Sequence, residues 1–177
     1  MNRRTLCIIG LSSVIGSTGN ALGAREETQP DHTVRIVRTF EAPPELVWRG
    51  WTEPDLLKRW VGSDPKGSVE SVRIDPKPGG SYEFVFRNSD GAEHATSGTY
   101  VAFEPHRRLA FTWTWRSEPG RETLIQIALE PSGGGTVMRF EHSKLWAGSS
   151  HNYEAGWGAT FDKFERAMRE AQAAGHR

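Results

Sequence analysis

Alternation between apolar and polar residues dominates the chain from Val69 to His142. Along six successive stretches about every second residue is apolar, which is the period of a β-strand that buries one face. These stretches are 69–74, 82–86, 96–104, 109–115, 125–129 and 138–142. Segments rich in Gly, Pro, Asn and Asp separate several of them, such as Asn88–Gly91 and Pro131–Gly135, and they are typical of turns. The pattern predicts an antiparallel meander of six strands.

The segment before the meander predicts one more strand and two short helices. Residues 34–40 alternate in the same way. Ala42–Pro43–Pro44 ends that strand and opens a helix, because proline is accommodated in a first helical turn. Thr52, followed by Pro54 and Asp55, predicts the capped start of the second helix.

The segment from His151 to Ala174 predicts a long C-terminal helix. Trp157, Phe161, Phe164 and Met168 recur at spacings of four, three and four residues and share one helix face. A sheet with one apolar face needs a cover, and this helix offers the matching stripe. We therefore predict one α+β domain at 34–174, in which a curved antiparallel sheet of about seven strands wraps around the C-terminal helix.

Residues 1–24 have the three parts of a secretory signal peptide. The positive pair Arg3–Arg4 precedes a mostly apolar run at Thr5–Gly16 and small residues at Ala21–Ala24. The run is shorter than the roughly 20 apolar residues that cross a bilayer. We expect an exported protein, periplasmic or secreted by the general secretory or twin-arginine route, with a flexible lead-in at 25–33. The alternative is an N-terminus without a targeting role.

Charge and cysteine content argue against several classes of partner. The first 24 residues hold two of the 22 basic side chains and no acid, so the rest carries 20 basic against 22 acidic side chains. This balance gives no electrostatic reason to expect a nucleic acid or an anionic membrane as partner. We also expect no stable membrane insertion after cleavage of the leader. The only cysteine, Cys7, lies in the leader, so the mature domain has no thiolate nucleophile. We expect no metal and no cofactor.

A series of short motifs runs in order through residues 33–170. They are Arg38–Pro43, Val47–Trp48, Trp51–Leu57, Arg59–Gly62, Pro78–Gly80, Gly98–Pro105, Arg108–Trp113, Gly135–Thr136 and Gly156–Trp157. In this order they resemble the activator-of-heat-shock-chaperone-ATPase-like (AHSA-type) family of the START-like, or SRPBCC, superfamily. The resemblance covers nearly all of the mature chain.

The resemblance implies a helix-grip fold with a cavity between the sheet and the C-terminal helix. Members of this superfamily bind lipids, hormones or polyketides, and a minority are enzymes. The eukaryotic namesake stimulates a cytosolic chaperone ATPase, a role that we do not expect of an exported protein. The first expectation is therefore that a small hydrophobic or amphipathic molecule binds in the cavity, without catalytic residues.

Aromatic side chains on the predicted inner faces, with a few other neighbours, are candidates to contact such a ligand. They are Trp48, Trp51, Tyr82, Phe84, Tyr100, Phe111, Trp113, Met138, His142, Trp157, Phe161 and Arg38. His142 shares its face with Met138 and Phe140, and could contact a ligand, carry a proton or be a satisfied core histidine. Arg38 could bind an anionic group, pair with an acid or reach water.

Two other functions stay open. One is an enzyme of the cyclase or aromatase type acting on an aromatic or polyketide-like substrate, with His142, Arg38 or Tyr100 near the chemistry. The other is a stress-related protein-interaction module with an exposed apolar patch near 62–67 or 145–150. Ser149–Ser150–His151 is predicted to cap the last helix, because neighbours in sequence seldom form a catalytic triad.

Overall fold

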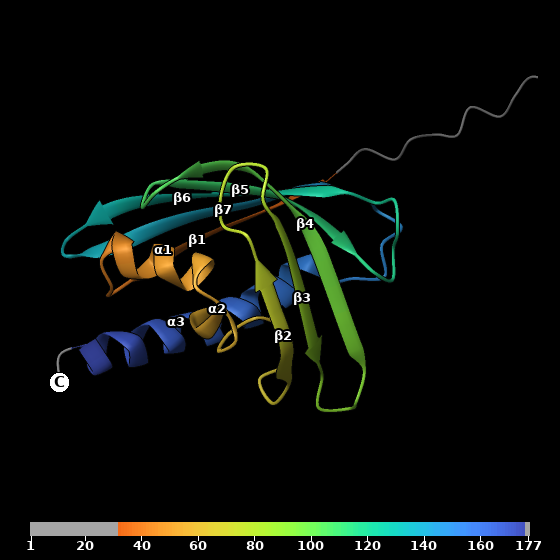
Figure 1. The fold of residues 1–177 in the computed structure, drawn as a ribbon, viewed down its shortest axis with the longest axis horizontal. Coiled ribbons are helices and arrows are strands. Elements are labelled where there is room, and N and C mark those ends of the chain that lie inside the picture. The colour runs from red at the N-terminus through yellow and green to blue at the C-terminus, as the bar shows by residue number, and fades with distance from the viewer. Residues whose placement is uncertain (1–31, 176–177) are drawn as a thin grey trace, which may run out of the picture.

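The computed structural model describes residues 32–175 and shows the predicted order of one strand, two short helices, six strands and a long helix (Figure 1). The elements are β1 His32–Phe40, α1 Pro44–Thr52, α2 Pro54–Leu57, β2 Ser68–Ile74, β3 Ser81–Arg87, β4 Glu93–Glu104, β5 Arg108–Trp115, β6 Thr123–Ser132, β7 Gly135–Leu145 and α3 Tyr153–Gly175. The predicted signal peptide at 1–24, and the lead-in up to residue 31, lie outside the described residues.

All seven strands form one antiparallel sheet in the order β1-β7-β6-β5-β4-β3-β2. The sheet curves, and α3 runs along its concave side (Figure 1). Helix α1 lies between the sheet and α3 towards the end of the molecule that holds the C-terminus (Figure 1), and α2 contacts α1 and β2. The α+β helix-grip architecture predicted from the alternating strands and the aromatic helix stripe is confirmed.

The strands extend further than the alternating residues that predicted them. β1 begins at His32, two residues before the predicted start, and β4 begins at Glu93 instead of residue 96. Backbone pairing continues at both starts through polar residues, as in the pairing of Arg87 with Glu93. Their side chains also form an ion pair, with 2.9 Å between Arg87 Nη2 and Glu93 Oε2. The alternation of apolar residues alone therefore places the start of a strand too late.

The core forms where the aromatic stripe of α3 meets the sheet and α1. Phe161 and Phe164 are fully buried, as predicted from their spacing. Gly50 of α1 lies against α3, and a Cβ at this position would come within 2.8 Å of the Phe164 ring. A larger residue would hold the two helices apart, so glycine is the residue that permits this close approach.

The predicted cap of α2 is wrong. The N-cap residue is Glu53, with no side-chain capping bond, whereas the Thr52 hydroxyl donates to the backbone oxygen of Trp48 one turn earlier in α1. A threonine at the end of one helix can bond back to its own turn, and this contact competes with capping the next helix.

Candidate functional site

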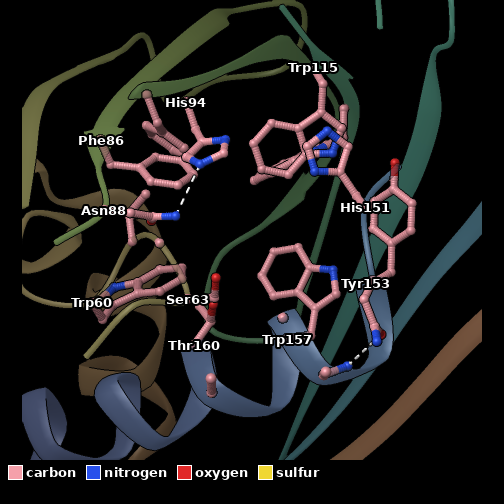
Figure 2. Close-up of a pocket in the computed structure, with 18 of the residues that line it drawn as sticks. Trp60, Ser63, Phe86, Asn88, His94, Trp115, His151, Tyr153, Trp157 and Thr160 are labelled. Carbon is pink, nitrogen blue, oxygen red and sulfur yellow. Dashed lines mark hydrogen bonds between the residues drawn. The ribbon is translucent and has the colours of Figure 1, made fainter. Parts of the chain in front are cut away.

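An aromatic cavity of about 410 Å³ lies between α3 and strands β3–β5 (Figure 2). Its wall includes the rings of Trp60, Phe84, Phe86, Trp113, Trp115 and Trp157. The loop after α2 and the residues that lead into α3 complete the wall. Its size falls within the range of about 300–1,000 Å³ that is usual for small-molecule pockets.

The cavity exists because the side chains that α3 turns towards the sheet change in size along the helix. From Phe161 onward, Phe161, Phe164 and Met168 fill the space under the sheet. In its first turns, Ala155, Gly156 and Ala159 line the cavity instead. A Cβ built on Gly156 would meet no atom within 4 Å, so this part of the helix leaves open space. Small residues at the start of α3 thus leave a hollow that aromatic rings enclose.

No Asp, Glu, Lys or Arg of the described residues lines this cavity, and its polar groups are uncharged amides and hydroxyls together with two imidazoles. His94 Nε2 lies 3.1 Å from Asn88 Nδ2. The His151 ring stacks on Trp115, with 4.2 Å between centroids and 16° between planes. Burial lowers the pKa of His151, although nearby Glu118 opposes that shift. His151 therefore favours the neutral form at neutral pH.

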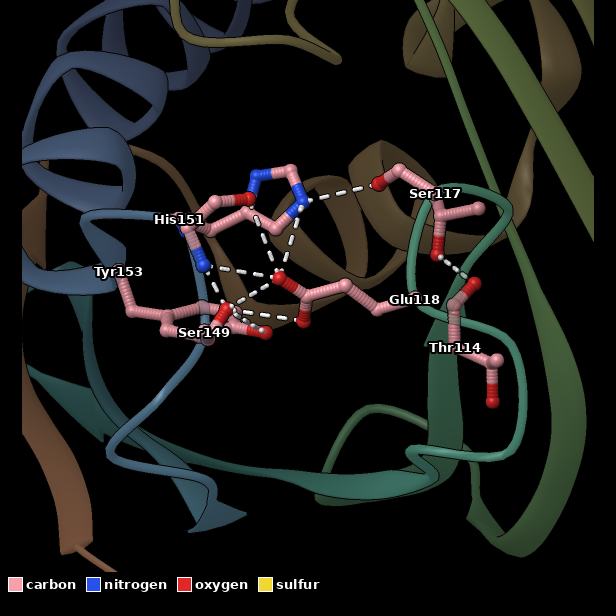
Figure 3. Close-up of polar contacts among 8 residues, drawn as sticks. Thr114, Ser117, Glu118, Ser149, His151 and Tyr153 are labelled. Atoms are coloured by element: carbon pink, nitrogen blue, oxygen red, sulfur yellow. Dashed lines mark hydrogen bonds and ion pairs between the residues drawn. The ribbon is translucent and has the colours of Figure 1, made fainter.

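Glu118, in the turn after β5, fastens the loop between β7 and α3 (Figure 3). Its carboxylate accepts bonds from Ser149 Oγ at 2.9 Å and from the backbone N–H of Ser150 at 2.9 Å. Partial burial opposes ionisation, but these bonds prevail and lower the pKa of Glu118. The predicted capping role of 149–151 is wrong, because the side chain that accepts from the first turn of α3 is Asn152.

Ser117, His151 and Glu118 lie close together but do not form a catalytic triad. Ser117 Oγ is 3.2 Å from His151 Nε2, and Glu118 Oε1 is 4.0 Å from the same nitrogen. In a triad the acid orients the imidazole through the nitrogen opposite to the one that serves the nucleophile. Here both partners compete for one nitrogen, so the arrangement fits a structural contact.

On the side of the cavity opposite Glu118, Lys163 of α3 holds the loop after α2. Its ammonium group donates to the backbone oxygens of Val61, Gly62 and Asp64, at 3.3, 3.0 and 3.1 Å. The Asp64 side chain accepts from the hydroxyl and the backbone N–H of Ser89, and these bonds lower its pKa to about 2. The loop after α2 is thus tied both to the helix and to the β3–β4 hairpin.

Only some of the predicted ligand-contacting residues lie at this cavity. Trp51, Phe84, Trp113 and Trp157 line it. The others lie elsewhere in the molecule: Trp48, Tyr82, Tyr100, Phe111, Met138, His142, Phe161 and Arg38. Most of these are core residues because the sheet there meets α1 or α3 directly, which leaves no space beside them.

His142 is sealed in the core. Trp157 Nε1 donates to its Nδ1 at 2.9 Å, so the ring proton lies on Nε2 and is donated to Thr123 Oγ1 at 2.7 Å. The Thr123 hydroxyl in turn donates to the backbone oxygen of Trp113. Burial lowers the pKa of His142 to about 3. It is a satisfied neutral core histidine, away from the cavity.

Arg38 and Tyr100 also lie away from the cavity. Arg38 Nη2 is 3.1 Å from Asp162 Oδ1 and also contacts the backbone oxygen of Gly158, so the arginine ties β1 to α3. Tyr100 is buried, and burial raises the pKa of its hydroxyl. The enzyme hypothesis placed His142, Arg38 and Tyr100 near the chemistry, and none of the three lines the cavity.

Several lining residues were absent from the predicted set, notably Trp60, Phe86, Asn88, His94, Trp115 and His151. The alternating pattern marks Phe86 and Trp115 as inner-face residues, and the small residues Ala155, Gly156 and Ala159 mark where α3 would leave space. The two histidines carry no such signal, because they come from the start of β4 and from the loop before α3, and the meeting of these segments depends on the tertiary fold.

Metal-ligand clusters and membrane-spanning helices were sought within residues 32–175. No group of three or more His, Cys, Asp or Glu in this part of the chain could hold a metal ion. None of the helices described there is both long and apolar enough to cross a bilayer.

Comparison with known proteins agrees with this architecture. A protein from Nitrosomonas europaea shares 28% identity over 80% of this chain and 96% of its own, with a TM-score of 0.69. An AHSA1-like protein from Aeromonas hydrophila shares 25% identity over 80% of this chain and 94% of its own, with a TM-score of 0.67. A protein of unknown function from Staphylococcus aureus, 23% identical over 81% of this chain and 97% of its own, shares the fold with a TM-score of 0.68.

No protein with curated annotation matches the chain. Residues 41–169 match the family described as "Activator of Hsp90 ATPase homolog 1-like protein". The matched segment begins at the end of β1 and reaches the last turns of α3, and therefore includes every wall of the cavity. The chain belongs to the Activator of Hsp90 ATPase homolog 1-like family.

Proposed function

We propose that this protein binds a small hydrophobic or amphipathic molecule in the aromatic cavity between α3 and β3–β5, and performs no chemistry on it. The observation that carries the proposal is the cavity itself, an unfilled space walled by indole and phenyl rings. Among the described residues that line it, only the histidines can acquire a charge near neutral pH. Apolar walls with a few polar groups at one end are typical of ligand sites.

The fastened rims support the same function. Glu118 holds the loop before α3, and Lys163 holds the loop after α2. Both loops contribute cavity residues, so these contacts keep the walls in place when the cavity is empty. A preformed site loses less conformational entropy on binding than a site that must be assembled.

Export of the protein is part of the proposal, on the evidence of the signal-peptide pattern in residues 1–24. A protein that acts outside the cytoplasm would not meet a cytosolic chaperone ATPase. An interaction module has weaker support, because the exposed aromatic of the 145–150 loop, Trp146, is a single ring under the Arg121 guanidinium at 4.3 Å.

The test is titration of the protein with N-phenyl-1-naphthylamine, an uncharged probe whose fluorescence rises in apolar surroundings. Gly156→Leu places a side chain in the cavity, whereas Gly158→Leu makes the same change on α3 at a position outside it. Both variants gain up to about 1 kcal/mol of helix propensity. We expect wild type and Gly158→Leu to bind the probe and Gly156→Leu to lose at least tenfold in affinity. Equal binding by all three proteins would refute the proposal.

A further inference from the structure

Two imidazoles lie edge to face at one end of the cavity. Their ring centroids are 6.4 Å apart, with His94 contributed by β4 and His151 by the loop before α3. Figure 2 shows His94 beside Phe86 and Asn88 on one wall, and His151 beside Trp115 on the other. Each ring is held by stacking, His94 on Phe86 at 5.5 Å and His151 on Trp115 at 4.2 Å. Side chains fixed in this way can orient a ligand group.

The hydrogen bonds around the two rings favour donors at this end. The Asn88 amide donates to His94 Nε2, which places the His94 proton on Nδ1. Ser117 Oγ can accept a hydrogen bond from His151 Nε2–H at 3.2 Å, and the Glu118 carboxylate lies 4.0 Å from the same nitrogen. His151 Nδ1 is then free to take up a second proton. Stacking on Trp115 also favours the imidazolium form, because an indole face attracts a cation.

The charged groups around this end are few. On the near side, Glu118 is the acid close to His151, and its oxygens already accept bonds from Ser149 and Ser150. The Tyr153 hydroxyl, on α3, is held neutral because burial raises its pKa. On the far rim, the Lys163 ammonium lies on the backbone oxygens of the loop after α2. An anion in the cavity would therefore meet two imidazoles, a lysine and the Asp64 carboxylate behind the far wall, and the Glu118 carboxylate, and both carboxylates already accept hydrogen bonds.

We propose that the cavity selects an amphipathic carboxylic acid with a compact aromatic body, whose rings lie among Trp60, Trp113 and Trp157 and whose carboxylate lies beside the neighbouring rings of His94 and His151. This inference rests on the proposed function and names the chemical class of its ligand. The two histidines are specificity-determining residues, since they distinguish an acid from a neutral molecule of the same shape.

Proton uptake accompanies this recognition. Burial lowers the pKa of His151 in the free protein, and a carboxylate beside the ring raises it again. A complex that holds a proton on an imidazole is favoured as pH falls. Affinity for the acid therefore increases from pH 8 to pH 6, whereas affinity for a neutral isostere stays constant.

The experiment compares 2-naphthoate with 2-naphthamide, which have the same rings and nearly the same shape, by displacement of N-phenyl-1-naphthylamine. At pH 6 we expect naphthoate to bind at least fivefold more tightly than naphthamide, and at pH 8 the preference should shrink. The double variant His94→Gln/His151→Gln should lose the preference and bind naphthoate and naphthamide with equal affinity at pH 6. His106→Asn, in a turn outside the cavity, should behave as wild type.

Calorimetry of wild type in buffers of different ionisation enthalpy gives a second readout that needs no variant. We expect net proton uptake when naphthoate binds at pH 7 and none when naphthamide binds. Equal affinities at pH 6, or naphthoate binding without proton uptake, would overturn the inference. If the neutral probe still binds the cavity in that case, the proposed function stands and only the acid preference fails. If the neutral probe does not bind, the proposed function fails as well.

Discussion

The buried histidine at position 142 makes a defined contribution to acid sensitivity. Its side chain is fully buried, and its folded-state pKa of about 3 lies below the ordinary value of 6.5 that the unfolded chain would show. The unfolded chain therefore binds a proton first, so the unfolding free energy falls as pH drops below 6.5 and continues to fall until the native histidine titrates. The slope is about 1.4 kcal/mol per pH unit, which amounts to about 2 kcal/mol between pH 7.5 and pH 5.0.

The perturbation is His142→Gln, which removes the titrating group and keeps a polar side chain beside Thr123. Loss of the bond from Trp157 costs about 1–3 kcal/mol at pH 7.5. The variant should then lose about 2 kcal/mol less than wild type on acidification to pH 5.0. Urea denaturation followed by tryptophan fluorescence at several pH values measures both changes.

The comparison isolates His142, because His151 and the carboxylates titrate in both proteins. Parallel curves of stability against pH for wild type and variant would show that His142 is protonated in the native state or exposed to water. Either result would refute the hydrogen-bond arrangement derived from Trp157 and Thr123.

Two further changes test the packing and the loop contacts. Gly50→Ala should lower the unfolding free energy by about 1–3 kcal/mol, because its Cβ would lie 2.8 Å from the Phe164 ring; an unchanged urea midpoint would contradict the close approach of α1 to α3. Glu118→Gln should weaken the bonds to the loop at 146–152 and increase amide hydrogen exchange there several-fold, with α1 as the internal reference; unchanged protection would show that Glu118 does not hold this loop.

The strand meander was predictable because buried and exposed residues alternate with the period of the backbone itself. The aromatic spacing of α3 predicted its buried face for the same reason, and both elements are confirmed. The ends of the strands were less predictable, since pairing at Glu93 and His32 uses backbone groups and carries no apolar signal.

The candidate site was predictable only in part. Sequence pattern distinguishes inner from outer faces, but it does not show which inner residues meet another element and which face empty space. His142 and Phe140 share a face, yet both lie under α3 and are fully packed. Trp115 lies at the end of β5, opposite the small residues near the start of α3, and therefore lines the cavity. His151 joins it through a loop whose position depends on Glu118, a contact between residues far apart in sequence.

The seven tryptophans provide the most direct test of ligand binding in this cavity. Trp51, Trp60, Trp113, Trp115 and Trp157 line it, whereas Trp48 packs near His106 and Trp146 lies in an exposed loop. The indole N–H signals of 15N-labelled protein should therefore be recorded during titration with N-phenyl-1-naphthylamine. The account predicts shifts for the five cavity tryptophans and fixed positions for Trp48 and Trp146. Shifts confined to Trp48 or Trp146, or no shifts at all, would contradict it.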